Sequence, residues 1–355
     1  MKRIYLDYAS LTPVDNRVKK AINKYYTEEY TNPSALYYSA INSKNAIDNA
    51  KRNIADILHI HSDEMIFTSG GTESNQLVLN SFLGKKILIS SIEHSSIINN
   101  QIDNKNILQI PIDKDGIVDL DQLKKMLNPE IDLISIMMVN NEIGTIQPIR
   151  EISKMIRDAG AKFNKRIIFH TDASQAPLHQ VLHLEKLNID LMTLDSNKIY
   201  GPRGIGMLYI KRNTLNINRP GTLNIPGIIG FSLALEIAEK MKEKETKRIF
   251  ELKNYFFNEL IKINSNIKMN GTIENTVPNI LNISIPNIDN EFFVLKLDAK
   301  GIECSTKSAC LRDEDESYVL KAINVDSKNT IRFSFGRKTS KGDLKRVLKV
   351  IKEIL

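Results

Sequence analysis

The feature that most constrains the fold is a series of short, almost uninterrupted apolar runs separated by stretches of helix length. The runs cover residues 64–69, 86–91, 132–139, 166–171 and 189–194. A strand with one face in water alternates apolar and polar residues, whereas a parallel strand covered on both faces is apolar throughout. The sequence therefore predicts an α/β fold built around a mostly parallel sheet with helices on both faces.

Polar residues with chemically useful side chains or backbones follow shortly after each run. They include Gly71, His94, Asn141, Asp172 and Lys198. In open α/β sheets, ligands bind at the carboxyl ends of the parallel strands. We therefore expect these five residues to gather around one binding site.

Lys198 is the most informative of the five. It lies between the run at 189–194 and a glycine-containing turn that leads into a further apolar run at 207–210. Removing an ammonium group from water is costly, and a desolvated lysine with a lowered pKa is suited to Schiff-base chemistry. For an isolated lysine, a side chain that extends from a loop into solvent is the commoner explanation. The other four residues favour a site.

The remaining residues indicate what the lysine would bind. Gly70, Gly71 and Thr72 fall between a predicted strand and a predicted helix. Free N–H groups and the helix dipole suit a phosphate there, although a plain turn also fits. Asp172 suits a protonated ring nitrogen, with a helix N-cap as the alternative. His94 is able to stack on an aromatic ring and transfer protons, with a structural histidine as the alternative. A phosphate, a pyridinium and an aldehyde held by lysine together describe pyridoxal 5′-phosphate.

Several longer motifs occur in a fixed order along the chain. They are Ile4–Pro13, Phe67–Ser74, Glu93–His94, Val139–Gly144, Asp172–Gln175, Lys198–Pro202, Ser308–Cys310, Ser317–Leu320 and Ile331–Ser334. In this order they resemble the cysteine desulfurases of the NifS/IscS type, which are class-V aminotransferase-like enzymes of pyridoxal-phosphate fold type I. The resemblance implies a large domain with a mostly parallel seven-stranded sheet, a smaller α/β C-terminal domain and a homodimer.

The resemblance also implies a role for each matching position. Lys198 would carry the cofactor, and His94 would stack on its ring and take part in proton transfer. Substrate would be bound by Asn32, Asn141 and Arg332, whose guanidinium suits the substrate carboxylate; a surface arginine beside a strand is the alternative for Arg332. The remaining cofactor contacts would be Gly71, Thr72, Asn141, Asp172, Gln175, Ser196 and Thr222, and the last of these would reach the partner subunit's cofactor.

Cys310 is the second decisive residue. It lies in a polar segment, residues 301–316, that the sequence predicts to form a loop. The resemblance implies that its thiolate takes sulfur from the substrate and holds it as a persulfide. Lys307 and Arg312 favour the thiolate, whereas the acidic residues 313–316 oppose it. Cys304 is expected to pack at a strand end, with a relay role as the alternative.

The predicted function is a pyridoxal-phosphate-dependent cysteine desulfurase. It would convert L-cysteine to L-alanine and pass sulfur to an acceptor protein of an iron–sulfur cluster or tRNA-thiolation pathway. One alternative is a related selenocysteine lyase or β-lyase, against which the retained Cys310 argues. The other is a catalytically weakened, partner-binding homologue. It is suggested by Asn197, where the family usually has histidine, and by a shortened segment before Thr222.

Composition agrees with this interpretation. The 355 residues are 42% hydrophobic and 26% charged, as in ordinary soluble enzymes. Two cysteines with no paired framework predict a protein of the reducing cytoplasm, and the lack of a membrane-length apolar run predicts that it does not use a membrane. No metal is expected among its site residues. The net charge is +7, but the lysines at 240–248 are interleaved with acidic residues. This pattern indicates a solvated helix, and we expect no direct nucleic-acid binding. That helix predicts a large domain of residues 13–245 and a small domain of residues 1–12 and 246–355.

Overall fold

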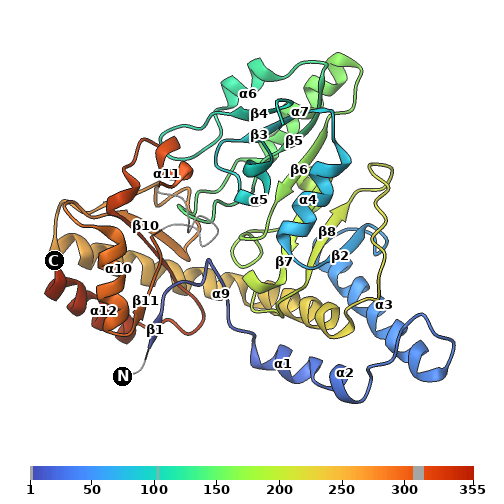
Figure 1. The fold of residues 1–355 in the computed structure, drawn as a ribbon, viewed down its shortest axis with the longest axis horizontal. Coiled ribbons are helices and arrows are strands. Elements are labelled where there is room, and N and C mark those ends of the chain that lie inside the picture. Colours follow the sequence, from blue (N-terminus) through green and yellow to red (C-terminus); the bar gives the residue numbers. More distant parts are fainter. Residues whose placement is uncertain (1–2, 102–103, 307–315) are drawn as a thin grey trace.

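A seven-stranded sheet forms the centre of the larger lobe in the computed structural model, which describes residues 3–101, 104–306 and 316–355 (Figure 1). Six strands run in one direction, and β8 is antiparallel to both of its neighbours. The predicted mostly parallel, seven-stranded sheet is therefore confirmed. In spatial order the strands are β2 (Met65–Thr68), β8 (Gly206–Ile210), β7 (Leu191–Asp195), β6 (Ile168–Asp172), β5 (Ile131–Ser135), β3 (Lys86–Ser90) and β4 (Ile107–Ile110).

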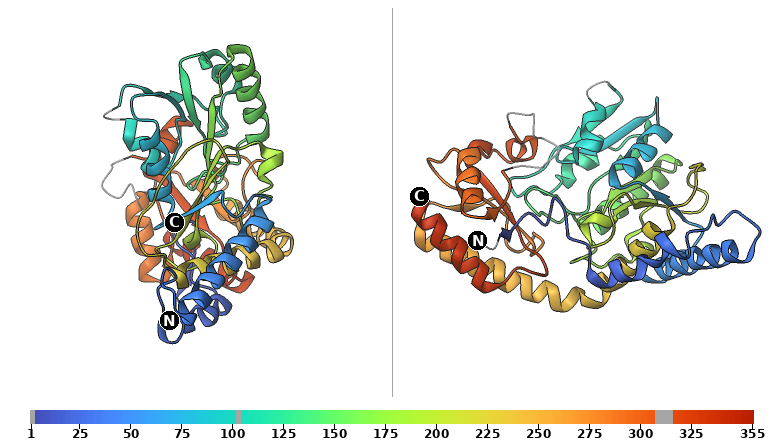
Figure 2. Two further views of the ribbon diagram at one scale, coloured as in Figure 1. Left: turned by 90° about the vertical axis from the view of Figure 1, so that its right-hand side faces the viewer. Right: turned by 60° about the horizontal axis from the view of Figure 1, so that its bottom comes forward.

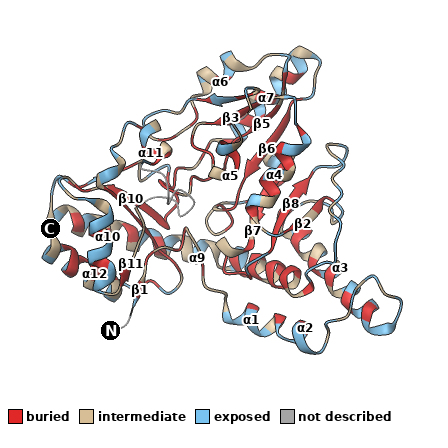
Figure 3. Ribbon diagram, viewed as in Figure 1, coloured by how far each residue is buried: buried red, intermediate tan, exposed pale blue. Residues whose placement is uncertain are grey.

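The apolar runs are continuous because both faces of this sheet are buried. Successive residues of one strand belong to different hydrophobic clusters: Ile87 packs on one face and Leu88 on the other. The first face is covered by α4 (Gly71–Ser81) and α5 (Ser95–Ile98). The hydrophobic cluster on the other face includes residues of α3 (Tyr38–Leu58), α7 (Ile149–Phe163) and α8 (Leu184–Leu187). Figure 3 shows the strands buried between these helices. The lobe also contains α1 (Asn16–Ile22), α2 (Lys24–Thr27) and α6 (Leu120–Met126).

The smaller lobe combines both ends of the chain. An antiparallel sheet has the order β12 (Thr330–Ser334), β10 (Ile280–Ser284), β9 (Lys268–Met269). Beside it, β1 (Ile4–Tyr5) pairs in parallel with β11 (Ile302–Glu303), so the N-terminal segment joins this lobe. The lobe's helices are α10 (Asn290–Ala299), α11 (Tyr318–Ala322) and α12 (Lys341–Ile354).

One 39-residue helix, α9 (Ile225–Ile263), runs through both lobes (Figures 1 and 2). Met241 packs against the core of the larger lobe, and Ile249 belongs to the core of the smaller one. The predicted boundary between residues 245 and 246 lies within this helix, between those two positions. The division into 13–245 and 1–12 with 246–355 stays a prediction. No helix in the described part of the chain is long and apolar enough to cross a membrane.

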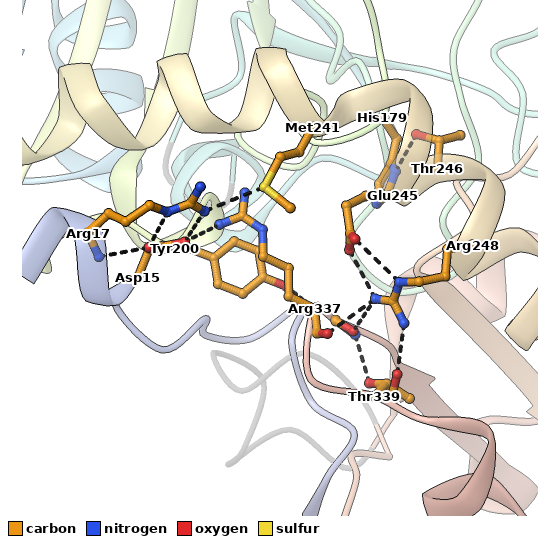
Figure 4. A network of polar contacts seen from close by, with 11 residues as sticks. Asp15, Arg17, His179, Tyr200, Met241, Glu245, Thr246, Arg248, Arg337 and Thr339 are labelled. Carbon is orange, nitrogen blue, oxygen red and sulfur yellow. Dashed lines mark hydrogen bonds and ion pairs between the residues drawn. The ribbon is translucent and has the colours of Figure 1, made fainter.

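Polar contacts also connect the lobes where they meet at α9 (Figure 4). Arg337, from the smaller lobe, donates to Asp15 Oδ2 at 2.8 Å and lies 4.1 Å from the centre of the Tyr200 ring. From α9, Arg248 donates to the carbonyl oxygens of Thr339 and Gly336 at 2.9 and 3.1 Å. These contacts hold the smaller lobe against the turn that follows Lys198.

Candidate active site

A cavity of about 220 Å³ opens at the carboxyl ends of the parallel strands. The N-terminal segment closes it on one side, and a strand of the smaller lobe contributes Arg332. Most of the sequence-predicted site residues therefore meet in one place, although they come from distant parts of the chain. The lining residues are Ala9, Ser10, Gly71, Thr72, Asn75, His94, Met137, Val139, Asn141, Asp172, Ser174, Gln175, Asp195, Asn197, Lys198 and Arg332.

Three predicted residues do not line this cavity. Ser196 is fully buried, and its Oγ lies so close to Gly201 that a Cβ at that glycine would be only 2.1 Å away. Asn32 and Thr222 are exposed on the surface. Cys310 lies outside the described residues.

Lys198 lies in the short helical turn after β7, and the N-terminal segment holds both its side chain and its turn. Its Nζ donates to the carbonyl oxygens of Ser10 and Ala9 at 2.5 and 3.2 Å. Thr12 Oγ1 donates to the carbonyl of Asn197 at 2.7 Å and accepts from the N–H of Tyr200 at 2.8 Å. The amine is thus aimed into the cavity by backbone carbonyls.

Asp172 is the last residue of β6 and is buried. Asn75 Nδ2 donates to its Oδ2 at 2.8 Å, and the Ser174 N–H donates to its Oδ1 at 2.9 Å. Gln175, in the same turn, donates from Nε2 to the Ala9 carbonyl at 2.8 Å. Asn75 was not among the predicted site residues. Its position one helical turn after Gly71 was the available signal, because residues four apart share a helix face.

His94 caps α5: its Nδ1 accepts from the Ser96 N–H at 3.2 Å and lies 2.9 Å from Ser96 Oγ. The preceding residue, Glu93, is completely buried and accepts hydrogen bonds from Ser90 Oγ at 2.5 Å and from the Met137 N–H at 2.7 Å. Burial raises the pKa of Glu93 to about 8. Its carboxyl group is therefore mostly protonated at neutral pH.

Arg332, on β12, is buried to 1% exposure. Its Nη1 donates to the Asn141 carbonyl at 2.9 Å, and its Nη2 donates to Asp7 Oδ1 at 2.7 Å. Its Nε has no hydrogen-bond partner within the described ranges. The nearby Cys304 packs against the core of the smaller lobe, and burial raises the pKa of its thiol far above the ordinary value. This agrees with the expectation that Cys304 packs at a strand end.

The N-terminus of α4 forms another part of the wall. The Gly71 N–H donates to Asp195 Oδ2 at 3.1 Å. Ser174 Oγ is buried, has no partner among residues 3–101, 104–306 and 316–355, and lies 3.2 Å from where a Cβ of Gly71 would be. Asp195 was missed by the sequence analysis, although it ends an apolar run like the predicted residues.

The residues of the cavity fit the aldehyde and ring of pyridoxal phosphate well and its phosphate group less well. Lys198, Asp172 and His94 suit its aldehyde and ring, and the unpartnered Ser174 hydroxyl with the α4 N-terminus suits its phosphate. The Asp195 carboxylate, in contrast, has the same sign of charge as a phosphate.

Comparisons with known proteins show which proteins the whole chain is similar to. The family model for class-V aminotransferases matches residues 4–220 and 217–347. The chain is 39% identical to cysteine desulfurase IscS of Dictyoglomus turgidum, covering 100% of this chain and 95% of that protein. It is 36% identical to cysteine desulfurase IscS of Methanosarcina thermophila, covering 100% and 92%. A solved NifS-like protein superimposes with a TM-score of 0.91 at 29% identity, covering 99% of both chains.

The match runs through both lobes, and the resemblance and fold predicted from the sequence are confirmed. The motifs quoted from the sequence supply most of the residues that line the cavity; Asn75, Met137, Asp195 and Asn197 lie outside them. The chain therefore belongs to the class-V aminotransferase family, whose members depend on pyridoxal 5′-phosphate, and within it to the NifS/IscS-like group.

Proposed function

We propose that the protein is a pyridoxal-phosphate-dependent cysteine desulfurase that converts L-cysteine to L-alanine and transfers the sulfur to its own Cys310. The observation that carries the proposal is that Lys198, Asp172 and His94 line the same cavity as Arg332. The full-length relatives named as cysteine desulfurases support the choice of substrate.

Each part of the cavity has a role in this proposal. Lys198 binds the cofactor aldehyde, Asp172 pairs with the ring nitrogen, and Gln175 contacts the ring oxygen. When bound, pyridoxal phosphate supplies an electron-withdrawing ring that stabilises negative charge on the substrate's α-carbon. The Asn75 and Ser174 hydrogen bonds to Asp172 keep its carboxylate in place. At the phosphate end, Gly71 and Thr72 supply N–H groups and a hydroxyl.

In this proposal Arg332 orients the substrate, and His94 and Lys198 transfer protons. Arg332 binds the substrate carboxylate, and its contacts with Asp7 and the Asn141 carbonyl fix the guanidinium plane. His94, oriented through Ser96, stacks on the ring and handles protons. The Lys198 amine is the second proton carrier at the same centre.

The expected partners are L-cysteine, a second copy of the chain and a sulfur-acceptor protein in the cytoplasm, which would serve iron–sulfur cluster assembly or tRNA thiolation. Two predicted contacts, Asn32 and Thr222, are exposed in one chain, as a role across a homodimer requires. The segment around Asn32 also exposes large apolar side chains that a second copy would cover, namely Tyr26, Tyr30, Leu36, Tyr37, Tyr38 and Ile41.

The two cysteines provide the test. Cys310→Ser should keep the cofactor absorbance and its change on addition of cysteine, but release no sulfide in the presence of a reductant. Cys304→Ser is the matched control and should stay active, because burial keeps that thiol protonated. Mass spectrometry after brief exposure to cysteine should find the added sulfur on the peptide that contains Cys310.

The same experiment separates the alternatives. A β-lyase or selenocysteine lyase needs no protein thiol to release its product, so normal cysteine turnover by Cys310→Ser would contradict the desulfurase. A wild-type protein that binds the cofactor but turns over no cysteine would favour the weakened homologue.

A further inference from the structure

Asp195 occupies the part of the cavity that a cofactor phosphate would enter. It ends β7 and lines the cavity beside Gly71 and Asn197. Its Oδ2 accepts the Gly71 N–H at 3.1 Å, and Gly71 is the first residue of α4. A phosphate bound at this helix end would need the same N–H group. The carboxylate and the phosphate therefore compete for one donor.

No cationic side chain in the described cavity lining is available to compensate the negative charge of Asp195 when a phosphate binds. The cationic side chains in the described cavity lining, Lys198 and Arg332, are needed for the aldehyde and the substrate carboxylate. Arg219 lies near the start of α4, but its guanidinium forms an ion pair with Glu73, with Nε 2.6 Å from Oε1. A phosphate dianion would thus approach a carboxylate with no additional cation assigned to it.

From this geometry we propose that Asp195 is an affinity-setting residue, an anion held in the phosphate cradle that weakens binding of the cofactor's phosphate group. The inference rests on the proposed function, because it assumes that pyridoxal phosphate is the ligand. Displacing Asp195 from Gly71 and bringing two like charges together both cost free energy. The neutral hydroxyl donors that remain for the phosphate are Thr72 and Ser174, and the buried Ser174 Oγ has no hydrogen-bond partner in the described part of the chain.

Asp195 also has a structural contact, since its Oδ1 accepts the Asn197 N–H at 3.0 Å. A purely structural role would make substitutions harmful to any ligand. Asparagine keeps an oxygen for Asn197 and removes the charge, so Asp195→Asn separates the two roles. Asp195→Ser is the second variant, because its shorter side chain also withdraws the competing acceptor from Gly71.

The experiment measures dissociation constants for two ligands by absorbance titration and by ligand-induced thermal shift. Pyridoxal 5′-phosphate carries the phosphate, and pyridoxal lacks it. We expect both Asp195 variants to bind pyridoxal phosphate about ten-fold more tightly than the wild type, with pyridoxal unchanged. Asp63→Asn is the charge-matched control: it removes one exposed carboxylate just before the amino end of β2, where Asp63 pairs with Arg212, and should change neither affinity.

The outcomes are distinguishable. Equal or weaker pyridoxal-phosphate binding by both variants would overturn the inference, as would the same gain for pyridoxal, because the effect would then not be directed at the phosphate. If the wild type and the variants bound neither ligand, the proposed function would fail and the inference with it.

Discussion

Glu93 is a carboxyl group without solvent access directly beside the cavity. Burial is the main reason that its pKa is raised from 4.5 to about 8, and the charge of Asp172 acts in the same direction. Below about pH 4.5 the group is protonated in both the folded and the unfolded protein, so its full contribution to stability is present there. As the pH rises towards 8, the unfolded chain loses this proton more readily, and stability falls.

We therefore predict that Glu93→Gln flattens the pH dependence of stability. Glutamine is neutral and keeps the oxygen that accepts from Ser90 and Met137, so at pH 8 the variant should be more stable by on the order of 3 kcal/mol. Urea unfolding between pH 5 and pH 9 measures this. Glu243→Gln, an exposed change on α9, should keep the wild-type slope. A Glu93→Gln profile as steep as the wild type's would contradict the assignment.

Arg332 should be sensitive even to a change that keeps its charge. Its planar guanidinium already spans Asp7 and the Asn141 carbonyl, and lysine has no second nitrogen to bind a carboxylate at the same time. We predict that Arg332→Lys raises the KM for cysteine at least about ten-fold and leaves the cofactor absorbance intact. Steady-state kinetics with the exposed control Arg203→Lys provide the comparison. An unchanged KM would remove Arg332 from substrate binding.

At the residue scale, sequence reasoning succeeded where a polar residue directly follows an apolar run. Asp172 and Lys198 both line the cavity as expected from that rule. The same rule pointed to Asp195, but Ser196 was chosen from the resemblance, and the structure turns Ser196 towards Gly201. Ala9 and Ser10 contribute only backbone carbonyls to Lys198, and a backbone contact leaves no signal in residue type.

At the scale of elements, the core strands were predictable and the small ones were not. In β7, for example, Leu191 belongs to one hydrophobic cluster and Met192 and Leu194 to the other, because the strand is covered on both faces. The strands β1 and β11 have two residues each, too few to show any periodicity. Of α9, the sequence indicated only the charged middle as a helix, since the first turns are mostly apolar and mostly buried.

The contact of α9 with the Lys198 turn depends on Gly230. Replacing glycine by alanine inside a helix usually stabilises it by about 1 kcal/mol. At Gly230, however, the new Cβ would be 2.4 Å from Pro202 Cγ and 3.0 Å from Ile22 Cγ2. Pro202 is a rigid ring in the turn that follows Lys198, so the clash has to move α9 or the turn.

We predict that Gly230→Ala lowers stability by about 1–3 kcal/mol despite the gain in helix propensity. Thermal unfolding of the cofactor-free protein, followed by circular dichroism, measures the change. Gly342→Ala in α12 is the matched control, because the nearest atom to its Cβ would be Ser340 Oγ at 3.7 Å. The control should be neutral or slightly stabilising, and a Gly230→Ala variant with the same result would show that α9 is not tightly fitted to the turn.

For the molecule as a whole, the relation between the lobes is what sequence patterns could not predict. The cavity needs Arg332 from the smaller lobe and Lys198 from the larger one. Besides the continuous α9, Arg337 connects the lobes through Asp15 and Tyr200, residues that are 322 and 137 positions away in the chain. Pairings over such separations are set by tertiary packing and have no local signature.

We predict that Arg337→Ala loosens this connection and lowers stability by about 2 kcal/mol, because it leaves the half-buried Asp15 with fewer partners and uncovers the Tyr200 ring. Hydrogen exchange should then rise in residues 12–22 and 198–202, on the larger-lobe side of the contact. Arg212→Ala breaks an equally direct ion pair with Asp63, but both side chains are more than half exposed, so this control should cost less than about 1 kcal/mol. If both variants lost the same stability and exchange near Lys198 stayed at the wild-type level, α9 alone would be holding the two halves of the cavity together.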